Sequence, residues 1–220
     1  MALTLYYHPL ASFCHKVLIA LYEHDVDFDK RVIDLDNEAE RAELEAIWPV
    51  GKFPVIRDHE RRRDVPETTI IIEYLDRFFA GSQRMIPVDW GQALDVRLWD
   101  RFFDSYVHAP MQRIVSDRIS GSHGDVSGER GMLRTAYTML EQRLGTRTWI
   151  AGDGFSMADC AAAPALFYAA TVEPFGDDSM HLAAYFDRLV GRASVHRVLE
   201  EAKPYFAMYP FAESIPARFR

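Results

Sequence analysis

The spacing of apolar residues changes once along this chain of 220 residues, and that change restricts its fold more than any other feature. In the first third, short β-prone runs are interleaved with stretches that have the spacing of a helix. After residue 90, every periodic stretch has helical spacing and no run is typical of a strand. Strand–helix–strand units favour a parallel sheet with helices on its faces. The sequence therefore predicts an α/β domain followed by an all-helical domain.

The first third is predicted to run strand, helix, strand, helix, strand, strand, helix. Strands are expected at residues 3–7, 28–33 and 51–56, and a charged hairpin tip at residues 58–64 leads to a short fourth strand. A helical pattern follows the first strand, and residues 38–48 are predicted to form a polar helix. The final helix has one apolar face, made by Ile71, Leu75, Phe78 and Phe79.

Residues 81–90 are predicted to link a domain at residues 1–80 to a domain at residues 91–220, because glycine and proline interrupt the pattern there. Helical apolar stripes follow, and the first of them comprises Leu94, Leu98, Phe102 and Tyr106. Within this second domain, Ser156 and Asp159 have the spacing of a capping box at a helix start. Such a cap contributes on the order of 1 kcal/mol, so we expect a structural role for Asp159.

Charge and cysteine content restrict the function classes. The 25 Lys and Arg against 33 Asp and Glu give a net charge of −8, whereas a nucleic-acid-binding protein usually has the opposite sign or at least a basic stripe. Cys14 and Cys160 lie in segments predicted as different helices, which argues against a disulfide framework and for a reducing compartment. No secretory signal, membrane-spanning stretch or metal-ligand spacing is evident, so a cytoplasmic location without membrane partners is expected.

Four short stretches, in this order and spacing, resemble the glutathione S-transferase superfamily across nearly the whole chain. The resemblance implies a thioredoxin-like N-terminal domain, an all-α helical-bundle C-terminal domain, and glutathione as the co-substrate. Within this superfamily, the chain resembles the serine-type zeta and theta classes more than the tyrosine-type classes. The stretches are residues 8–17 (HPLASFCHKV), 51–55 (GKFPV), 66–70 (PETTI) and 156–159 (SMAD).

The resemblance implies a set of glutathione-binding residues in the first domain. Glu67 and Thr68, at a helix start, would hold the γ-glutamyl group, since a helix N-terminus suits a carboxylate. Phe53 would bind the cysteinyl part through its backbone, before a cis Pro54, and Lys52 could meet the glycyl carboxylate. Without the resemblance, Glu67 could simply complement the helix dipole, Thr68 could cap the helix, and Lys52 could be solvated.

Ser12 is the candidate that would stabilise the glutathione thiolate. A free thiol has a pKa of about 8.5, and a charge-assisted hydrogen bond of roughly 1.5–3 kcal/mol would lower it by roughly one to two units. In similar proteins the activating serine, or a nucleophilic cysteine, aligns with Ala11, which can do neither job. Three interpretations follow. Ser12 stabilises the thiolate in place of the residue at position 11, or backbone amides around Phe13 are sufficient to stabilise it, or the site binds glutathione with little turnover.

The side chains near this loop have simpler expected roles. Cys14 aligns with the second, resolving cysteine of a Cys-x-x-Cys site, but position 11 holds an alanine instead of the first cysteine. We therefore expect Cys14 to be a packed, inert thiol. His8 and His15 flank the loop, and each is a lone histidine with no assigned role.

The leading hypothesis is a cytosolic glutathione transferase-like homodimer that adds the thiol to a small hydrophobic electrophile, or isomerises it. Tyr106, His108 and Met111 are expected to line the electrophile pocket between the domains, with core packing as the competing interpretation. The alternative is a catalytically weak binding or scaffold protein. Its aromatic tail at residues 205–211 could dock a partner or fold back over the second domain.

Overall fold

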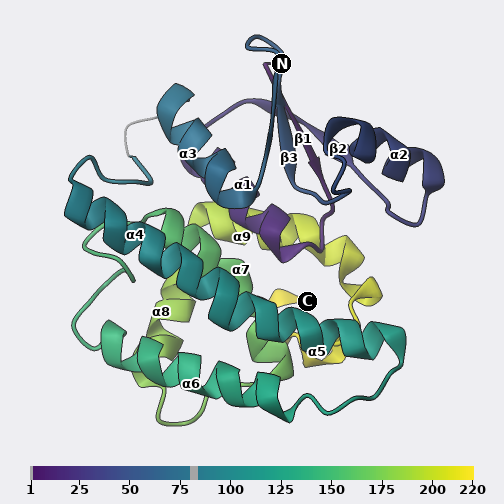
Figure 1. Ribbon diagram of the computed structural model, residues 1–220. Helices are drawn as coiled ribbons and strands as arrows, with labels where there is room; N and C mark the ends of the chain where they lie inside the picture. Colours follow the sequence, from purple (N-terminus) through teal and green to yellow (C-terminus); the bar gives the residue numbers. More distant parts are fainter. Residues whose placement is uncertain (1, 80–83) are drawn as a thin grey trace. The chain divides into compact units, whose positions relative to one another are not determined.

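A four-stranded sheet forms the centre of the N-terminal part of the chain, with strand order β2-β1-β3-β4 (Figure 1). β1 (Leu3–Tyr7) pairs in parallel with β2 (Phe28–Val32) and antiparallel with β3 (Val55–Asp58). β4 (Arg63–Pro66) pairs antiparallel with β3. The parallel pair is joined through α1 (Ser12–Glu23), as a strand–helix–strand unit requires. The predicted α/β, thioredoxin-like class is confirmed.

Helices cover both faces of this sheet. Leu5 and Ile56 are register partners that point to the face on which α1 and α3 (Thr68–Phe78) lie against each other. The next residues along these strands point to the other face, which α2 (Glu38–Ile47) covers. The buried cluster on that side comprises Tyr6, Ile33, Leu44 and Val55.

The computed structural model describes residues 2–79 and 84–220, which belong to two units, Met1–Met85 and Ile86–Arg220. The first part of the predicted linker, residues 81–83, lies outside the described residues, as does Ala80. Residues 84–89 form no helix or strand, and the next helix begins at Trp90. Within the described residues, no helix is both long and apolar enough to cross a membrane.

The second unit is helical, as predicted, and is built around α7 (Met157–Val172), which is buried along almost its whole length. Among residues 84–220 the structure has one isolated β-bridge and no strand. The elements that pack against α7 are α4 (Trp90–Phe102), a π-helix (Phe103–His108), α5 (Ala109–Ser120) and α8 (Met180–Val190). The other elements of this unit are α6 (Ser127–Leu144), α9 (Ala193–Ala202) and three short 3-10 helices, Lys203–Met208, Ala212–Ser214 and Ala217–Phe219.

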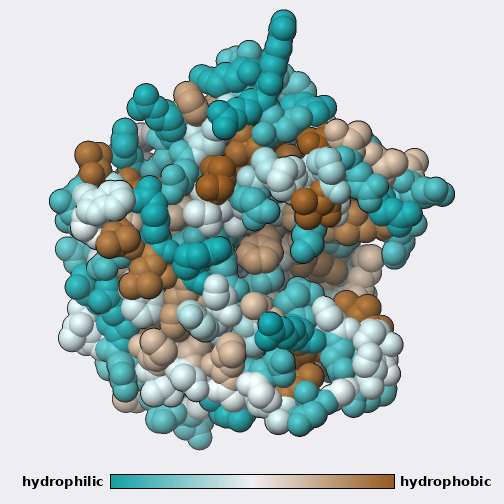
Figure 2. All heavy atoms as spheres, in the orientation of Figure 1, coloured by the Kyte–Doolittle hydropathy of each residue, from teal (hydrophilic) through white to brown (hydrophobic). Residues whose placement is uncertain are grey.

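The apolar stripe predicted on α4 is not a buried face. Leu94 and Leu98 are 54% and 58% exposed, and Tyr106 in the π-helix is 52% exposed, whereas Phe102 is buried. Figure 2 shows apolar side chains scattered among hydrophilic ones on the face where α4 lies. The helical spacing therefore predicted that a helix forms here, but it did not show which side of this helix packs against other elements. The same holds for Phe78 of α3, which is 44% exposed.

The aromatic tail folds back onto the second unit, which was one of the two predicted possibilities. The hydroxyl groups of Tyr209 and Thr171 lie 2.8 Å apart. The ring of Phe206 stacks on Phe167 of α7 with 6.0 Å between centroids. These contacts bury Phe206 and Tyr209 within their own unit, so the tail does not present them to a partner.

Candidate functional site

The register of the sheet brings three predicted site segments to one end of the first unit. Tyr6 of β1 pairs with Val55 of β3, and Val55 pairs with Pro66 of β4. Because these neighbouring strands are antiparallel, the chain leaves β1, enters β3 and leaves β4 at the same end of the sheet. The segments that follow or precede these paired residues are the loop at residues 8–12, Phe53–Pro54, and Glu67–Thr68.

The Phe53–Pro54 peptide bond is cis, as expected. The third strand begins at Val55 rather than at Gly51, so the predicted start of this strand was wrong. Gly51 has a φ of 66° and donates its N–H to Trp48, which makes residues 48–51 a turn. The backbone of Phe53 therefore lies outside the strand ladder, in the position where an extended ligand could pair with it.

The start of α3 has the features of an anion-binding helix N-terminus. Its first residue is Thr68, which is buried, and Glu67 precedes it with a φ of 69°, a conformation that costs about 1–3 kcal/mol outside glycine. In the described part of the chain, the Glu67 side chain makes no capping hydrogen bond. The first amides of a helix lack intrahelical acceptors and carry the positive end of its dipole.

A buried lysine adds positive charge beside this helix start. The Nζ atom of Lys16 donates a hydrogen bond to Thr69 Oγ1 at 3.3 Å, and Lys16 is only 1% exposed. Nothing in the sequence predicts a role for Lys16. Its helical spacing could not show that α1 and α3 lie side by side, which is what places the ammonium group near the start of α3.

Hydrogen bonds to both histidines hold the loop between β1 and α1. The N–H of Leu10 donates to His8 Nδ1 at 3.2 Å, and the N–H of Ala11 donates to the His8 carbonyl at 3.1 Å. The Nε2 atom of His15 lies 2.5 Å from the Pro9 carbonyl oxygen. A carbonyl can only accept, so His15 carries a proton on Nε2 and donates it. The loop is therefore tied both to itself and to the first turns of α1.

Ser12 is the first residue of α1, and its hydroxyl is buried. Within residues 2–79 and 84–220, the Ser12 Oγ atom has no hydrogen-bond partner. Burying a hydroxyl group without a hydrogen-bond partner lowers the free energy of unfolding by about 1–3 kcal/mol. A buried serine at this position therefore needs an explanation. A ligand atom that accepts from this hydroxyl would supply one.

Cys14 is the packed thiol that was expected. It is fully buried, and burial raises the pKa of its thiol well above the ordinary range, although a hydrogen bond from the His8 backbone opposes this rise. A thiol that resists ionisation is a poor nucleophile and a poor metal ligand. Among the described residues, no group of histidine, cysteine and acidic side chains could hold a metal ion.

The three residues expected around the electrophile differ in exposure. Tyr106 in the π-helix is 52% exposed and packs against Phe102 with 5.5 Å between ring centroids. His108 and Met111 are buried at 7% and 2% exposure. Of the three, Tyr106 offers the most surface to a ligand, and core packing describes Met111 better.

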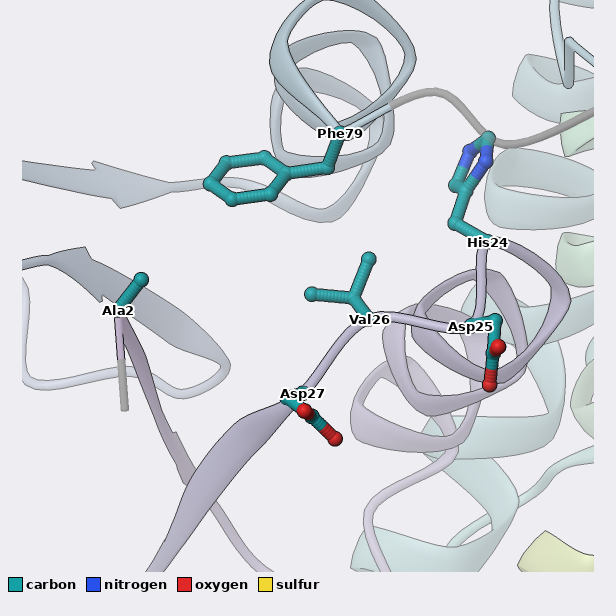
Figure 3. A pocket seen from close by; sticks show the side chains of 6 residues that line it. All are labelled: Ala2, His24, Asp25, Val26, Asp27 and Phe79. Atoms are coloured by element: carbon teal, nitrogen blue, oxygen red, sulfur yellow. The ribbon is translucent and has the colours of Figure 1, made fainter.

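A separate hollow of about 400 Å³ lies at the opposite end of the sheet, beside the start of β1 and the end of α1. Figure 3 shows Phe79 and Val26 facing this space, while the carboxylates of Asp25 and Asp27 point away from it. None of its described lining residues is a lysine or an arginine, so this hollow offers no such side chain to bind a carboxylate. It shares none of its lining with the predicted glutathione-binding residues.

Comparisons with known proteins match both units to one family. Residues 5–83 match the model for the glutathione S-transferase N-terminal domain, and residues 123–189 match the model for its C-terminal domain. Glutathione S-transferase U25 of Arabidopsis thaliana is 29% identical over 207 residues, which is 91% of this chain and 90% of that protein. Glutathione S-transferase F7 of the same plant is 24% identical, over 87% of this chain and 96% of that protein.

Solved structures show the same fold. A delta-class glutathione transferase of Nilaparvata lugens has a TM-score of 0.84 and 18% identity, covering 97% of this chain and 100% of that chain. The expected zeta- or theta-like class is not supported, because the relatives found are mainly plant phi- and tau-class proteins. The short stretches that suggested this class identify the family without separating its classes.

Proposed function

Since the chain belongs to the glutathione S-transferase family, we propose that it is an enzyme that binds glutathione and transfers or uses its thiol. The observation that carries this proposal is the sheet register that gathers the loop at residues 8–12, Phe53–Pro54 and Glu67–Thr68 at one end of the first unit. Each segment supplies a different kind of group, and together they match the charges and the thiol of the tripeptide.

In this proposal, the binding groups divide the tripeptide between them. The start of α3 and the Thr68 hydroxyl receive the γ-glutamyl carboxylate, and Glu67 takes the ammonium group. The backbone N–H and C=O of Phe53 pair with the cysteinyl part, in the manner of an added strand. Lys52, which is exposed, meets the glycyl carboxylate.

Stabilisation of the thiolate falls to the start of α1. The Ser12 hydroxyl or the amides around Phe13 donate to the sulfur, and the helix dipole adds to their effect. The thiolate then forms a bond to an electrophilic carbon, and the leaving group departs with its bonding electrons. The unsatisfied Ser12 hydroxyl supports the first of these two donors.

The second substrate in this proposal is a small hydrophobic electrophile, met chiefly by the exposed ring of Tyr106, with His108 and Met111 as the other proposed pocket residues. A homodimer in the cytoplasm completes the proposal. The dimer, though not the location, is supported by exposed apolar side chains on one helix of each unit, Ile70 of α3 and Leu94 and Leu98 of α4. Analytical ultracentrifugation of the purified protein tests the dimer, and a sedimentation coefficient that corresponds to a monomer would refute it.

Two measurements on the purified protein test the function. We expect retention on immobilised glutathione, elution by free glutathione, and turnover of an activated aryl halide. Glu67→Ala should weaken retention, whereas Glu60→Ala, a matched change at the exposed hairpin, should not. Failure of the wild type to be retained would overturn the proposal.

Retention without turnover would instead favour the alternative, a binding or scaffold protein. Ala11 still motivates that alternative. The packed tail removes its second motivation, since Phe206 and Tyr209 are buried.

A further inference from the structure

The side chain of His8 contacts two parts of the proposed glutathione site at once. Its Nδ1 atom accepts the Leu10 N–H at 3.2 Å, which closes a turn in the loop before Ser12. Its ring stacks on the ring of Phe53, with 6.0 Å between centroids and 18° between planes. Phe53 is the residue whose backbone lies outside the ladder, next to Pro54.

We propose that His8 is a positioning residue that couples the loop at the start of α1 to Phe53. It would keep the donors to the glutathione sulfur at a constant distance from the backbone that holds the cysteinyl part. This inference depends on the proposed function, and it assigns to His8 a role in orienting the reactants rather than in proton transfer.

An imidazole is suited to this role because it combines two properties. Its flat ring gives stacking area against Phe53, and its Nδ1 atom accepts the N–H two residues further along the chain. The acceptance at Nδ1 places the proton of the neutral ring on Nε2. Phenylalanine would keep the stacking area without the acceptor, and asparagine would keep an acceptor of similar reach without the stacking area.

These two substitutions separate the two contacts. In His8→Phe we expect glutathione affinity within about twofold of the wild type, while the pKa of the bound thiol, followed by thiolate absorbance, rises by roughly half to one unit. In His8→Asn we expect roughly three- to tenfold weaker binding by calorimetry, with the bound thiol near its wild-type pKa. His196→Asn, at an exposed position of α9, is the matched control and should change neither quantity.

A double-mutant cycle tests the coupling even where a single variant is less stable. Phe53→Leu removes the stack from its other side, so it should weaken binding as His8→Asn does, and the double variant should bind no worse than either single one. Additive losses would overturn the inference. The inference would also be overturned if His8→Phe and His8→Asn both changed only the glutathione affinity, or both changed only the pKa of the bound thiol. It would likewise be overturned if both variants behaved as the wild type does.

The wild-type measurement separates this inference from the function on which it depends. A wild-type protein that binds no glutathione would overturn the proposed function and this inference together. A wild type that binds, with unaffected His8 variants, would overturn this inference alone.

Discussion

The hydroxyl of Tyr185 donates a hydrogen bond to Asp159 Oδ1 at 2.6 Å, although the two residues lie on different helices. The same carboxylate accepts the N–H of Ile150 and both the N–H and the hydroxyl of Ser156. The predicted capping box is thus present, and its acidic member has a further partner. Asp159 is fully buried, and burial raises the pKa of its carboxyl group against the effect of these donors.

Removing the Tyr185 hydroxyl should therefore destabilise the fold without affecting ligand binding. Tyr185→Phe leaves a buried carboxylate with one donor fewer, and we expect the free energy of unfolding to fall by about 1–3 kcal/mol. Denaturant unfolding measures this loss. Tyr106→Phe, with an exposed ring, is the control and should unfold as the wild type does. A Tyr185→Phe protein of unchanged stability would show that this hydrogen bond contributes nothing net.

Ser12 should show opposite effects on activity and on stability. Ser12→Ala removes the proposed donor to the sulfur, so turnover of an aryl halide should fall by about tenfold or more while glutathione affinity changes little. It also removes a buried hydroxyl that lacks a partner in the described structure, so unfolding should cost about 1 kcal/mol more. Unchanged turnover would assign thiolate stabilisation to the backbone amides around Phe13.

Glu67 combines a proposed binding role with a strained backbone. Glu67→Gly should relieve the φ of 69° and raise the free energy of unfolding by about 1 kcal/mol, while glutathione affinity falls by about tenfold or more. Arg62→Gly is a matched control, because Arg62 also has a positive φ, of 51°, but lies in the hairpin. It should gain stability and keep its affinity. If both variants bind glutathione equally well, Glu67 has no part in binding.

His8 should make stability depend on pH on the acidic side. Burial lowers its pKa below the ordinary 6.5, and the nearby Asp34 opposes this only in part. Between the lowered native pKa and 6.5 the unfolded chain binds a proton that the native protein does not, so the free energy of unfolding decreases as pH falls through this range. His8→Phe lacks this dependence. Parallel curves for both proteins between pH 7.5 and 5 would contradict the expectation.

Local signals were sufficient for much of the first unit. Strand β1 and helix α2 were predicted nearly to the residue, because their apolar spacing and their boundaries are encoded within a few neighbouring positions. The residues expected to hold glutathione came from a resemblance, and the structure brings Phe53–Pro54 and Glu67–Thr68 to one end of the sheet.

The type and order of the elements in the first unit and the cap at Ser156 therefore follow from the sequence alone, because they depend on contacts between near neighbours. The exposure of Leu94 and Leu98, the hydrogen bond from Lys16 to Thr69 and the stacking of His8 on Phe53 became visible only once the chain was folded. Each of these depends on which elements become neighbours in space, and periodicity along one helix carries no information about the element that packs against it.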